Sequence, residues 1–217
     1  MGGDVGFLLF GLTGGLASGK SSVAARWRGR GLEIIDADDL AREVLAPGTP
    51  GLAQVVEAFG PGIVNEAGAL DRKGLATLVF ADAEARKKLE AITHPLIVAA
   101  TLQRASDLEA KDELVACYEA TLLVERGLAD LFRPLVVVAS NERDQIARAK
   151  SRDNLSAEQA KARIAAQLPL KDKIAAADYV IQNQRDLGAL IARADEVLDA
   201  ICQKAGVNPE RYPKRVP

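Results

Sequence analysis

The chain has 217 residues, 48% of them hydrophobic, and its 28 Lys and Arg residues nearly balance its 30 Asp and Glu residues. This apolar content excludes a disordered or fibrous protein, and a formal net charge of -2 excludes the overall basic field that drives non-specific nucleic-acid binding. No uncharged run approaches the ~20 apolar residues of a membrane span, and no basic segment of a signal peptide precedes the first apolar run. The two cysteines, Cys117 and Cys202, fit free, buried thiols in a reducing cytoplasm.

Short apolar runs alternate with helical patterns along most of the chain. We expect a first helix at residues 20–30, a last helix at residues 187–205, and strands at residues 7–12, 31–36, 113–118, 134–140 and 178–181. Strands that alternate with helices pair in parallel through right-handed crossovers. The sequence therefore predicts an α/β fold with one five-stranded parallel sheet flanked by helices.

Two helical stretches do not fit this alternation. Residues 71–110 form an all-helical insertion, in which Asp71 is interpreted as a helix N-cap and Pro95 as part of the first turn of a helix. Residues 148–173 form a charged helical pair around a turn. Insertions of this kind often cover an active site. The segment NPERYPKRVP, residues 208–217, is expected to form a mobile tail.

The strongest chemical signal is GGLASGKS, residues 14–21, which matches the phosphate-loop pattern GxxxxGK[ST] and lies between the first strand and the first helix. Its glycines let successive N–H groups point at a phosphate, and the helix adds the positive end of its dipole. Lys20 would reach the β- and γ-phosphates, Ser21 would ligate Mg²⁺, and Ser22 could donate to the α-phosphate. We therefore predict that a nucleoside triphosphate is bound by Gly14, Gly15, Leu16, Ala17, Ser18, Gly19, Lys20, Ser21 and Ser22.

Two further segments separate a kinase from a GTPase switch. The guanine-reading motif NKxD has no match, because NQRD at residues 183–186 lacks the lysine. At the end of the second strand, Asp36 and Asp38 share a face of an extended segment beside the phosphate loop. One of them could accept the proton of an acceptor hydroxyl or orient that hydroxyl, while the other holds water on Mg²⁺ or caps the following helix. Alternatively, Asp36, Asp38 and Asp39 are all helix N-cap residues.

Arginines and a histidine complete the candidate residues. Arg148, Arg152 and Arg163 would suit the charge of a phosphoryl group in transfer, although a solvated helix face also explains them. For the only histidine, His94, spacing alone favours a structural role.

Together these motifs resemble the dephospho-CoA kinase family from residue 7 to about residue 205. The resemblance is carried, in order along the chain, by residues 12–22, 35–51, 70–97, 148–173 and 177–183. It implies a nucleoside-monophosphate-kinase-like P-loop fold and ATP-dependent phosphorylation of the ribose 3′-hydroxyl of dephospho-CoA, giving coenzyme A and ADP with Mg²⁺. Another small-molecule kinase of the same fold, or a nucleotide-dependent switch, is the alternative.

The resemblance also assigns roles and boundaries. Asp38 is the expected general base or acceptor-orienting residue, Arg148 and Arg152 are the lid arginines, and Asn183 and Gln184 lie near adenine. The acceptor side is lined by Thr13, Asp36, His94 and Glu125. The nucleotide-binding core is expected at residues 5–60, 111–147 and 174–205, a helical domain for the CoA precursor at 61–110, the lid at 148–173 and the tail at 206–217. One departure is Thr121, which replaces the proline that the family usually has after the third strand, and this puts acceptor affinity in doubt.

Overall fold

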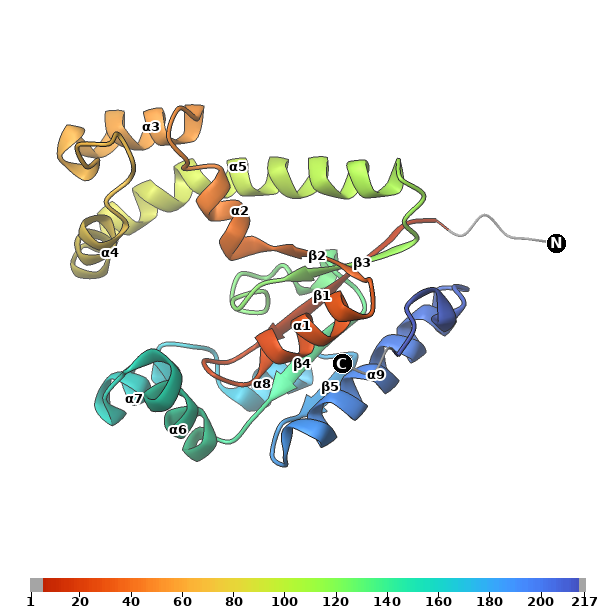
Figure 1. Ribbon diagram of the computed structural model, residues 1–217. Coiled ribbons are helices and arrows are strands. Elements are labelled where there is room, and N and C mark those ends of the chain that lie inside the picture. Colours follow the sequence, from red (N-terminus) through yellow and green to blue (C-terminus); the bar gives the residue numbers. More distant parts are fainter. Residues whose placement is uncertain (1–5, 215–217) are drawn as a thin grey trace. The chain divides into compact units, whose positions relative to one another are not determined.

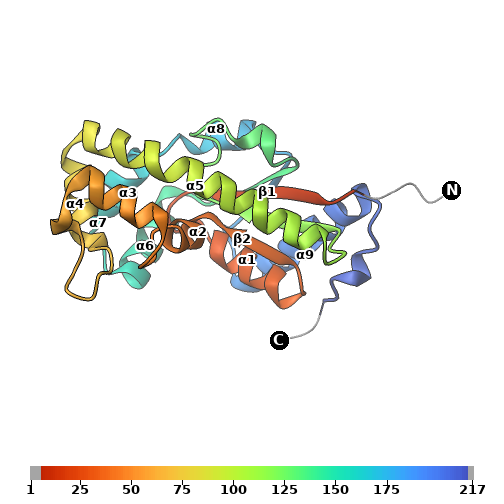
Figure 2. The ribbon, with the colours of Figure 1, turned by 90° about the horizontal axis from the view of Figure 1, so that it is seen from above.

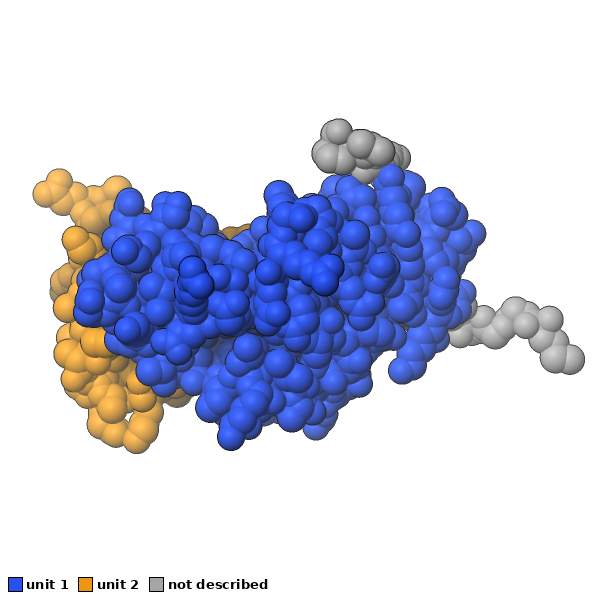
Figure 3. Space-filling view, turned by 90° about the horizontal axis from the view of Figure 1, so that it is seen from below, with its two compact units in different colours: residues 1–35, 108–217 blue, residues 36–107 orange. Residues whose placement is uncertain are grey.

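The computed structural model describes residues 6–214 (Figure 1). The chain divides into two compact units, coloured separately in Figure 3: residues 1–35 with 108–217, and residues 36–107. The second unit therefore includes residues 36–60, which the sequence grouped with the nucleotide-binding core. Positions 1–5 and 215–217, which hold the first residue of the expected core and the end of the expected tail, lie outside the described residues.

The first unit is built around one five-stranded sheet. Its strands are β1 (Leu8–Gly14), β2 (Glu33–Asp36), β3 (Val115–Glu119), β4 (Leu135–Ala139) and β5 (Tyr179–Gln182), and they lie in the order β2-β3-β1-β4-β5. β1 pairs in parallel with β3 and β4, and β4 pairs in parallel with β5. Every residue of β3 and β4 is buried, as expected for strands covered on both faces. This confirms the predicted sheet, and no strand end differs from its predicted position by more than two residues.

Helices α1 (Lys20–Gly29) and α9 (Leu187–Lys204) pack against each other and share one apolar core with the sheet (Figure 1). Trp27 of α1 is fully buried and lies edge-on to Phe10 of β1, with ring centroids 5.4 Å apart. Its indole N–H donates to the Ala194 carbonyl oxygen of α9 at 2.9 Å. This packing fixes the position of α1, whose first turn directly follows the phosphate loop.

The segment between β4 and β5 contains α6 (Glu142–Asp153), α7 (Ala157–Ala165) and the short α8 (Leu170–Ala175), which Figure 2 shows from above. Asn141 caps α6, and Ser156 forms a reciprocal capping box with Gln159 at the start of α7. This confirms the predicted helical pair and its intervening turn. Two short 3₁₀ helices, at Ala129–Leu131 and Pro209–Arg211, complete the first unit.

The second unit is helical and has a small core of its own. It contains α2 (Ala37–Glu43), α3 (Pro50–Phe59), a 3₁₀ turn (Pro61–Ile63), α4 (Arg72–Ala81) and most of α5 (Ala83–Glu109). Asp71 caps α4 by accepting from the Gly74 N–H at 3.0 Å, which confirms the predicted cap. The buried members of the core are Leu45, Leu52, Val55, Leu70 and Leu75.

Pro95 lies inside α5 and not at the start of a helix, so that prediction is wrong. Proline cannot donate a backbone hydrogen bond and normally interrupts a helix. α5 nevertheless runs through 27 residues, and Leu89 and Ile92, just before the proline, pack against the core of the second unit. Tertiary packing therefore outweighs the local preference at this position.

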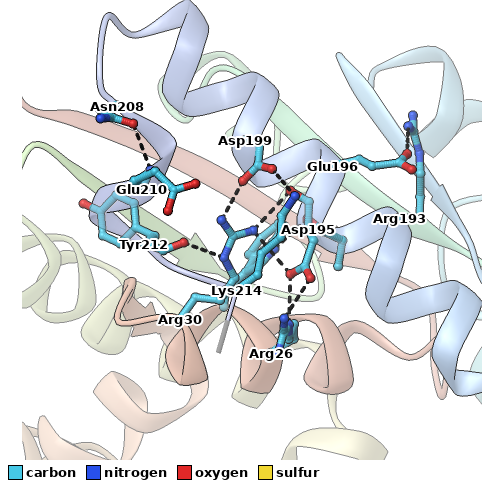
Figure 4. A network of polar contacts seen from close by, with 12 residues as sticks. Arg26, Arg30, Arg193, Asp195, Glu196, Asp199, Asn208, Glu210, Tyr212 and Lys214 are labelled. Atoms are coloured by element: carbon cyan, nitrogen blue, oxygen red, sulfur yellow. Dashed lines mark hydrogen bonds and ion pairs between the residues drawn. The ribbon is translucent and has the colours of Figure 1, made fainter. Parts of the chain in front are cut away.

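The described residues that follow α9 are held by contacts with the first unit, so the prediction of a mobile tail is wrong for residues 208–214. The Tyr212 side chain is buried, and its hydroxyl donates to the Val115 carbonyl oxygen of β3 at 3.2 Å. The Tyr212 carbonyl oxygen accepts from the Arg30 guanidinium at 2.8 Å, and Arg30 also pairs with Asp199 of α9 at 2.5 Å (Figure 4). One buried ring and one buried guanidinium thus fix a segment whose composition is that of a flexible end.

Within the described residues, no helix combines the length and the apolar character that crossing a bilayer requires. Both cysteines are free and buried, as predicted. Burial raises the pKa of the Cys117 thiol well above its usual value and that of the Cys202 thiol to about 11, so both thiols are protonated at neutral pH.

Candidate active site

The phosphate loop connects β1 to α1 and turns through two left-handed residues. Gly19 has φ 102°, and a Cβ at this position would collide with the Asn183 amide, so a side chain is excluded there. Ala17 has φ 50°, and the Ser18 N–H donates to the Gly15 carbonyl oxygen at 3.1 Å. α1 begins directly after this turn without a side-chain cap. Its first N–H groups can therefore be bound by an anion.

Asn183 and Arg148 contact two carbonyl oxygens of this loop. The Asn183 side-chain amide donates to the Ser18 carbonyl oxygen at 2.7 Å, and Asn183 is almost fully buried. The Arg148 guanidinium donates to Ser140 Oγ at 2.9 Å and lies 3.4 Å from the Ala17 carbonyl oxygen. The structure thus brings Asn183 and Arg148 together with the loop, from the end of β5 and from α6.

Two glutamines that no sequence pattern indicates bind the loop at Leu16. The Gln145 side-chain amide donates to the Leu16 carbonyl oxygen at 2.7 Å, while the Leu16 N–H donates to Gln167 Oε1 at 3.0 Å. A single glutamine in a helical segment carries no signal that distinguishes it from a surface residue. Only the structure shows that these two side chains meet.

Lys20 forms an ion pair with a buried carboxylate at the end of β3. Its Nζ lies 2.7 Å from Glu119 Oε1, and the two side chains are 15% and 3% exposed. The Arg28 guanidinium lies 3.4 Å from the other Glu119 oxygen. Sequence reasoning gave Glu119 no role, although an acidic residue at the carboxyl end of a strand beside β1 is a recognisable signal.

Thr13 of β1 and Lys173 of α8 both contact the segment that follows β3, which contains Glu125. The Thr13 hydroxyl donates to the Thr121 carbonyl oxygen at 3.0 Å. Lys173 of α8, whose side chain is 1% exposed, pairs with Glu125 at 2.5 Å and lies 3.4 Å from the same Thr121 carbonyl oxygen. Glu125, a predicted acceptor residue, is therefore engaged by a buried lysine, and its Oε2 is buried without a hydrogen-bond partner in the described residues.

Asp36, Asp38 and His94 belong to the second unit. Asp36 caps α2, because its carboxylate accepts from the N–H groups of Asp38 and Asp39 at 2.8 and 3.3 Å. Asp38, in the first turn of α2, is exposed, whereas His94 is half-buried in α5. Capping therefore accounts for Asp36, whereas the carboxylates of Asp38 and Asp39 are both exposed.

The remaining predicted residues lie at the surface of the first unit. Arg152 pairs with its neighbour Asp153 at 2.7 Å, and this pairing raises the pKa of Arg152 and lowers that of Asp153. Ser21 and Gln184 are exposed, and Ser22 is half-buried. Of the predicted lid arginines, Arg148 thus contacts the phosphate loop, whereas Arg152 is paired away from it.

A parallel sheet of order 2-3-1-4-5, a phosphate loop between β1 and α1, and an arginine-bearing helical segment after β4 define a P-loop kinase. A family model described as dephospho-CoA kinase matches residues 8–188. The chain belongs to the dephospho-CoA kinase family.

Individual relatives and solved structures support membership of this family. The curated dephospho-CoA kinase of Anaeromyxobacter dehalogenans is 45% identical over 88% of this chain and 90% of its own length. A crystal structure from Thermus thermophilus, 32% identical, superposes with a TM-score of 0.80 over 90% of this chain and 98% of its own. The structure of dephospho-CoA kinase from Campylobacter jejuni, 28% identical, superposes with a TM-score of 0.69 over the same shares of the two chains.

Proposed function

We propose that this protein transfers the γ-phosphoryl group of ATP to the ribose 3′-hydroxyl of dephospho-CoA and releases coenzyme A and ADP, the last step of coenzyme A synthesis. The phosphate loop, backed by Lys20, Arg148 and Asn183, is the observation that carries the proposal, together with membership of the family. The partners are then two small molecules, with no nucleic acid or membrane. Two free, buried thiols suit a reducing cytoplasm as the place of action.

ATP binding is assigned to the loop and the start of α1. The N–H groups of the loop and of the first turn of α1, other than those of Leu16 and Ser18, which already donate within the protein, bind the β- and α-phosphates, and the α1 dipole favours their charge. Lys20 moves from Glu119 toward the β- and γ-phosphates, which compete with that carboxylate for its ammonium group. Asn183 and Gln184, after β5, lie on the adenine side.

Mg²⁺ fits the oxygen donors of this loop. Ser21 follows Lys20 in the first turn of α1, and its side chain is exposed, so its hydroxyl would hold the ion. The described residues contain no group of three His, Cys, Asp or Glu that could hold a metal alone, which suits an ion that keeps phosphate oxygens and waters as its other ligands. When bound, Mg²⁺ neutralises charge on the β- and γ-phosphates.

The acceptor hydroxyl is activated by Asp38. Its carboxylate takes the proton of the 3′-hydroxyl while the hydroxyl oxygen forms a bond to the γ-phosphorus. The bond from that phosphorus to the β–γ bridging oxygen breaks, and ADP carries away the electron pair. Thr13, Asp36, His94 and Glu125 serve on the acceptor side.

Two helical segments bring the substrates together. Residues 61–110 hold the CoA precursor, and residues 148–173 act as a lid that closes over ATP. Within the lid, Arg148 supports the loop and Arg152 leaves Asp153 to meet the transferring phosphoryl group. Thr121 in place of the family proline changes the wall of the acceptor site and is expected to change acceptor affinity.

The test is ADP release measured with purified protein and Mg-ATP, with and without dephospho-CoA. Dephospho-CoA should stimulate ADP release strongly, and mass spectrometry should identify coenzyme A. Shikimate and nucleoside monophosphates serve as control acceptors that separate this activity from that of another kinase of the same fold. Tight ATP binding without acceptor-dependent turnover would instead indicate a nucleotide-dependent switch.

A further inference from the structure

The two ends of the segment between β4 and β5 both bind one residue of the phosphate loop. Gln145 lies in α6, shortly after β4, and Gln167 follows α7, shortly before α8. Gln145 Nε2 donates to the Leu16 carbonyl oxygen at 2.7 Å, and Gln167 Oε1 accepts from the Leu16 N–H at 3.0 Å. Both backbone groups of Leu16 are therefore satisfied by this segment.

The direction of these two bonds is fixed by chemistry. A carbonyl oxygen can only accept and an amide N–H can only donate, so Gln145 must present its NH₂ group and Gln167 its oxygen. The two glutamines consequently need different halves of the same side-chain amide. A substitution that keeps one half and removes the other should affect the two positions differently.

Apolar contacts support the same junction. Ala17, Ala149 and Ala160 form a small buried cluster, and Leu16, Ile146 and Leu155 pack against it. The loop, α6 and α7 thus share side-chain contacts as well as the two hydrogen bonds. A movement of α6 and α7 away from the loop would break all of them together.

We propose that Gln145 and Gln167 are positioning residues that couple the segment between β4 and β5, which contains the lid, to the phosphate loop. They hold Leu16 so that its two backbone groups face the lid and the rest of the loop faces the phosphates, and they act only through Leu16. This inference rests on the proposed kinase function for its effect on turnover. Its effect on nucleotide binding does not depend on the identity of the acceptor.

The decisive comparison is Gln145→Glu against Gln167→Glu. Both variants add the same negative charge beside the same residue, so repulsion of ATP is common to both. In Gln167→Glu a carboxylate still accepts from the Leu16 N–H, whereas in Gln145→Glu a carboxylate faces a carbonyl oxygen and cannot donate. We expect Gln145→Glu to lower kcat and ATP affinity about tenfold further than Gln167→Glu, the factor typical of one lost hydrogen bond.

Three measurements complete the test. Gln167→Leu removes the hydrogen-bond acceptor of the Leu16 N–H. Titration calorimetry should therefore show that this variant binds Mg-ATP more weakly than Gln167→Glu does. Gln203→Glu, an exposed glutamine of α9, controls for added charge and should match the unsubstituted protein. Melting temperatures that stay close to that of the unsubstituted protein would exclude a merely structural role.

Equal losses in Gln145→Glu and Gln167→Glu would overturn the inference. So would a Gln167→Leu variant that binds Mg-ATP as well as Gln167→Glu does. If the unsubstituted protein fails to phosphorylate dephospho-CoA, the proposed function fails, yet the order of ATP affinities among the variants still decides the inference.

Discussion

Lys20→Met removes a charge that acts both on phosphate and on Glu119. Removing one partner of a buried ion pair typically costs about 3–5 kcal/mol, because the other charge stays buried without compensation. Here Glu119 is 3% exposed and its ammonium partner lies at 2.7 Å, but Arg28 remains 3.4 Å from its second oxygen. With Arg28 left as a partial partner, we expect a loss of about 2 kcal/mol in the free energy of unfolding.

Scanning calorimetry and an ADP-release assay separate the two roles. For a chain of this length, 1 kcal/mol moves the melting temperature by about 2–4 °C, so Lys20→Met should melt about 4–8 °C lower and lose phosphoryl transfer. The double variant Lys20→Met/Glu119→Gln removes both charges, so it should recover most of the stability and none of the activity. Lys87→Met, which breaks an exposed pair with Glu84, is the matched control and should change the melting temperature little.

Two results would refute this reasoning. A Lys20→Met protein that melts at the temperature of the Lys87→Met control would mean that Glu119 does not need the lysine charge. A double variant less stable than Lys20→Met would mean that the carboxylate is stabilised by other partners.

Three further outcomes are expected. Asp38→Asn should lower kcat by ~10²–10⁴-fold with ATP affinity nearly unchanged, whereas Asp36→Asn should cost far less because asparagine also caps helices; equal losses in steady-state kinetics would contradict this division. Arg152→Ala should lower kcat more than it raises the KM for ATP. Arg148→Ala should mainly raise the KM for ATP, because this variant loses the contact of Arg148 with the loop. The reverse pattern would mean that each arginine has the role assigned here to the other. Burial raises the pKa of Tyr212 to about 12, above its unfolded value of about 10, so its contribution to stability is complete below that lower value and is lost as pH rises between the two. Tyr212→Phe should lose ~1 kcal/mol at neutral pH and show a smaller alkaline decline in chemical denaturation, and an alkaline decline equal to that of the unsubstituted protein would count against this assignment.

The parts of the fold that follow from local patterns were predictable from the sequence. Continuous apolar runs such as the one at β4 indicate buried parallel strands, and GGLASGKS defines both the chemistry of the loop and its place between β1 and α1. The cap at Asp71 was also recognisable, because a capping carboxylate acts within one helical turn.

Contacts between distant residues were not predictable from one sequence. Tyr212 and Arg30 lie at opposite ends of the chain, and neither residue type indicates a partner so far away. The same holds for Gln145 and Gln167, which become informative only when they meet at Leu16. The prediction that Pro95 lies in the first turn of a helix was wrong for the opposite reason, since the local preference of proline is strong and tertiary packing overrides it.

The interruption of the first unit by the second has a consequence for synthesis on the ribosome. Residues 36–107 leave the ribosome as one uninterrupted stretch, so the second unit can form its own apolar core early. β1, made first, must wait for both of its neighbours, since Leu8 pairs with Val115 and Gly11 with Leu135. The phosphate loop, which depends on β1 and on residues as late as Asn183, is therefore completed only when nearly the whole chain has emerged. Until then the apolar strand that precedes it is exposed to chaperones and to aggregation.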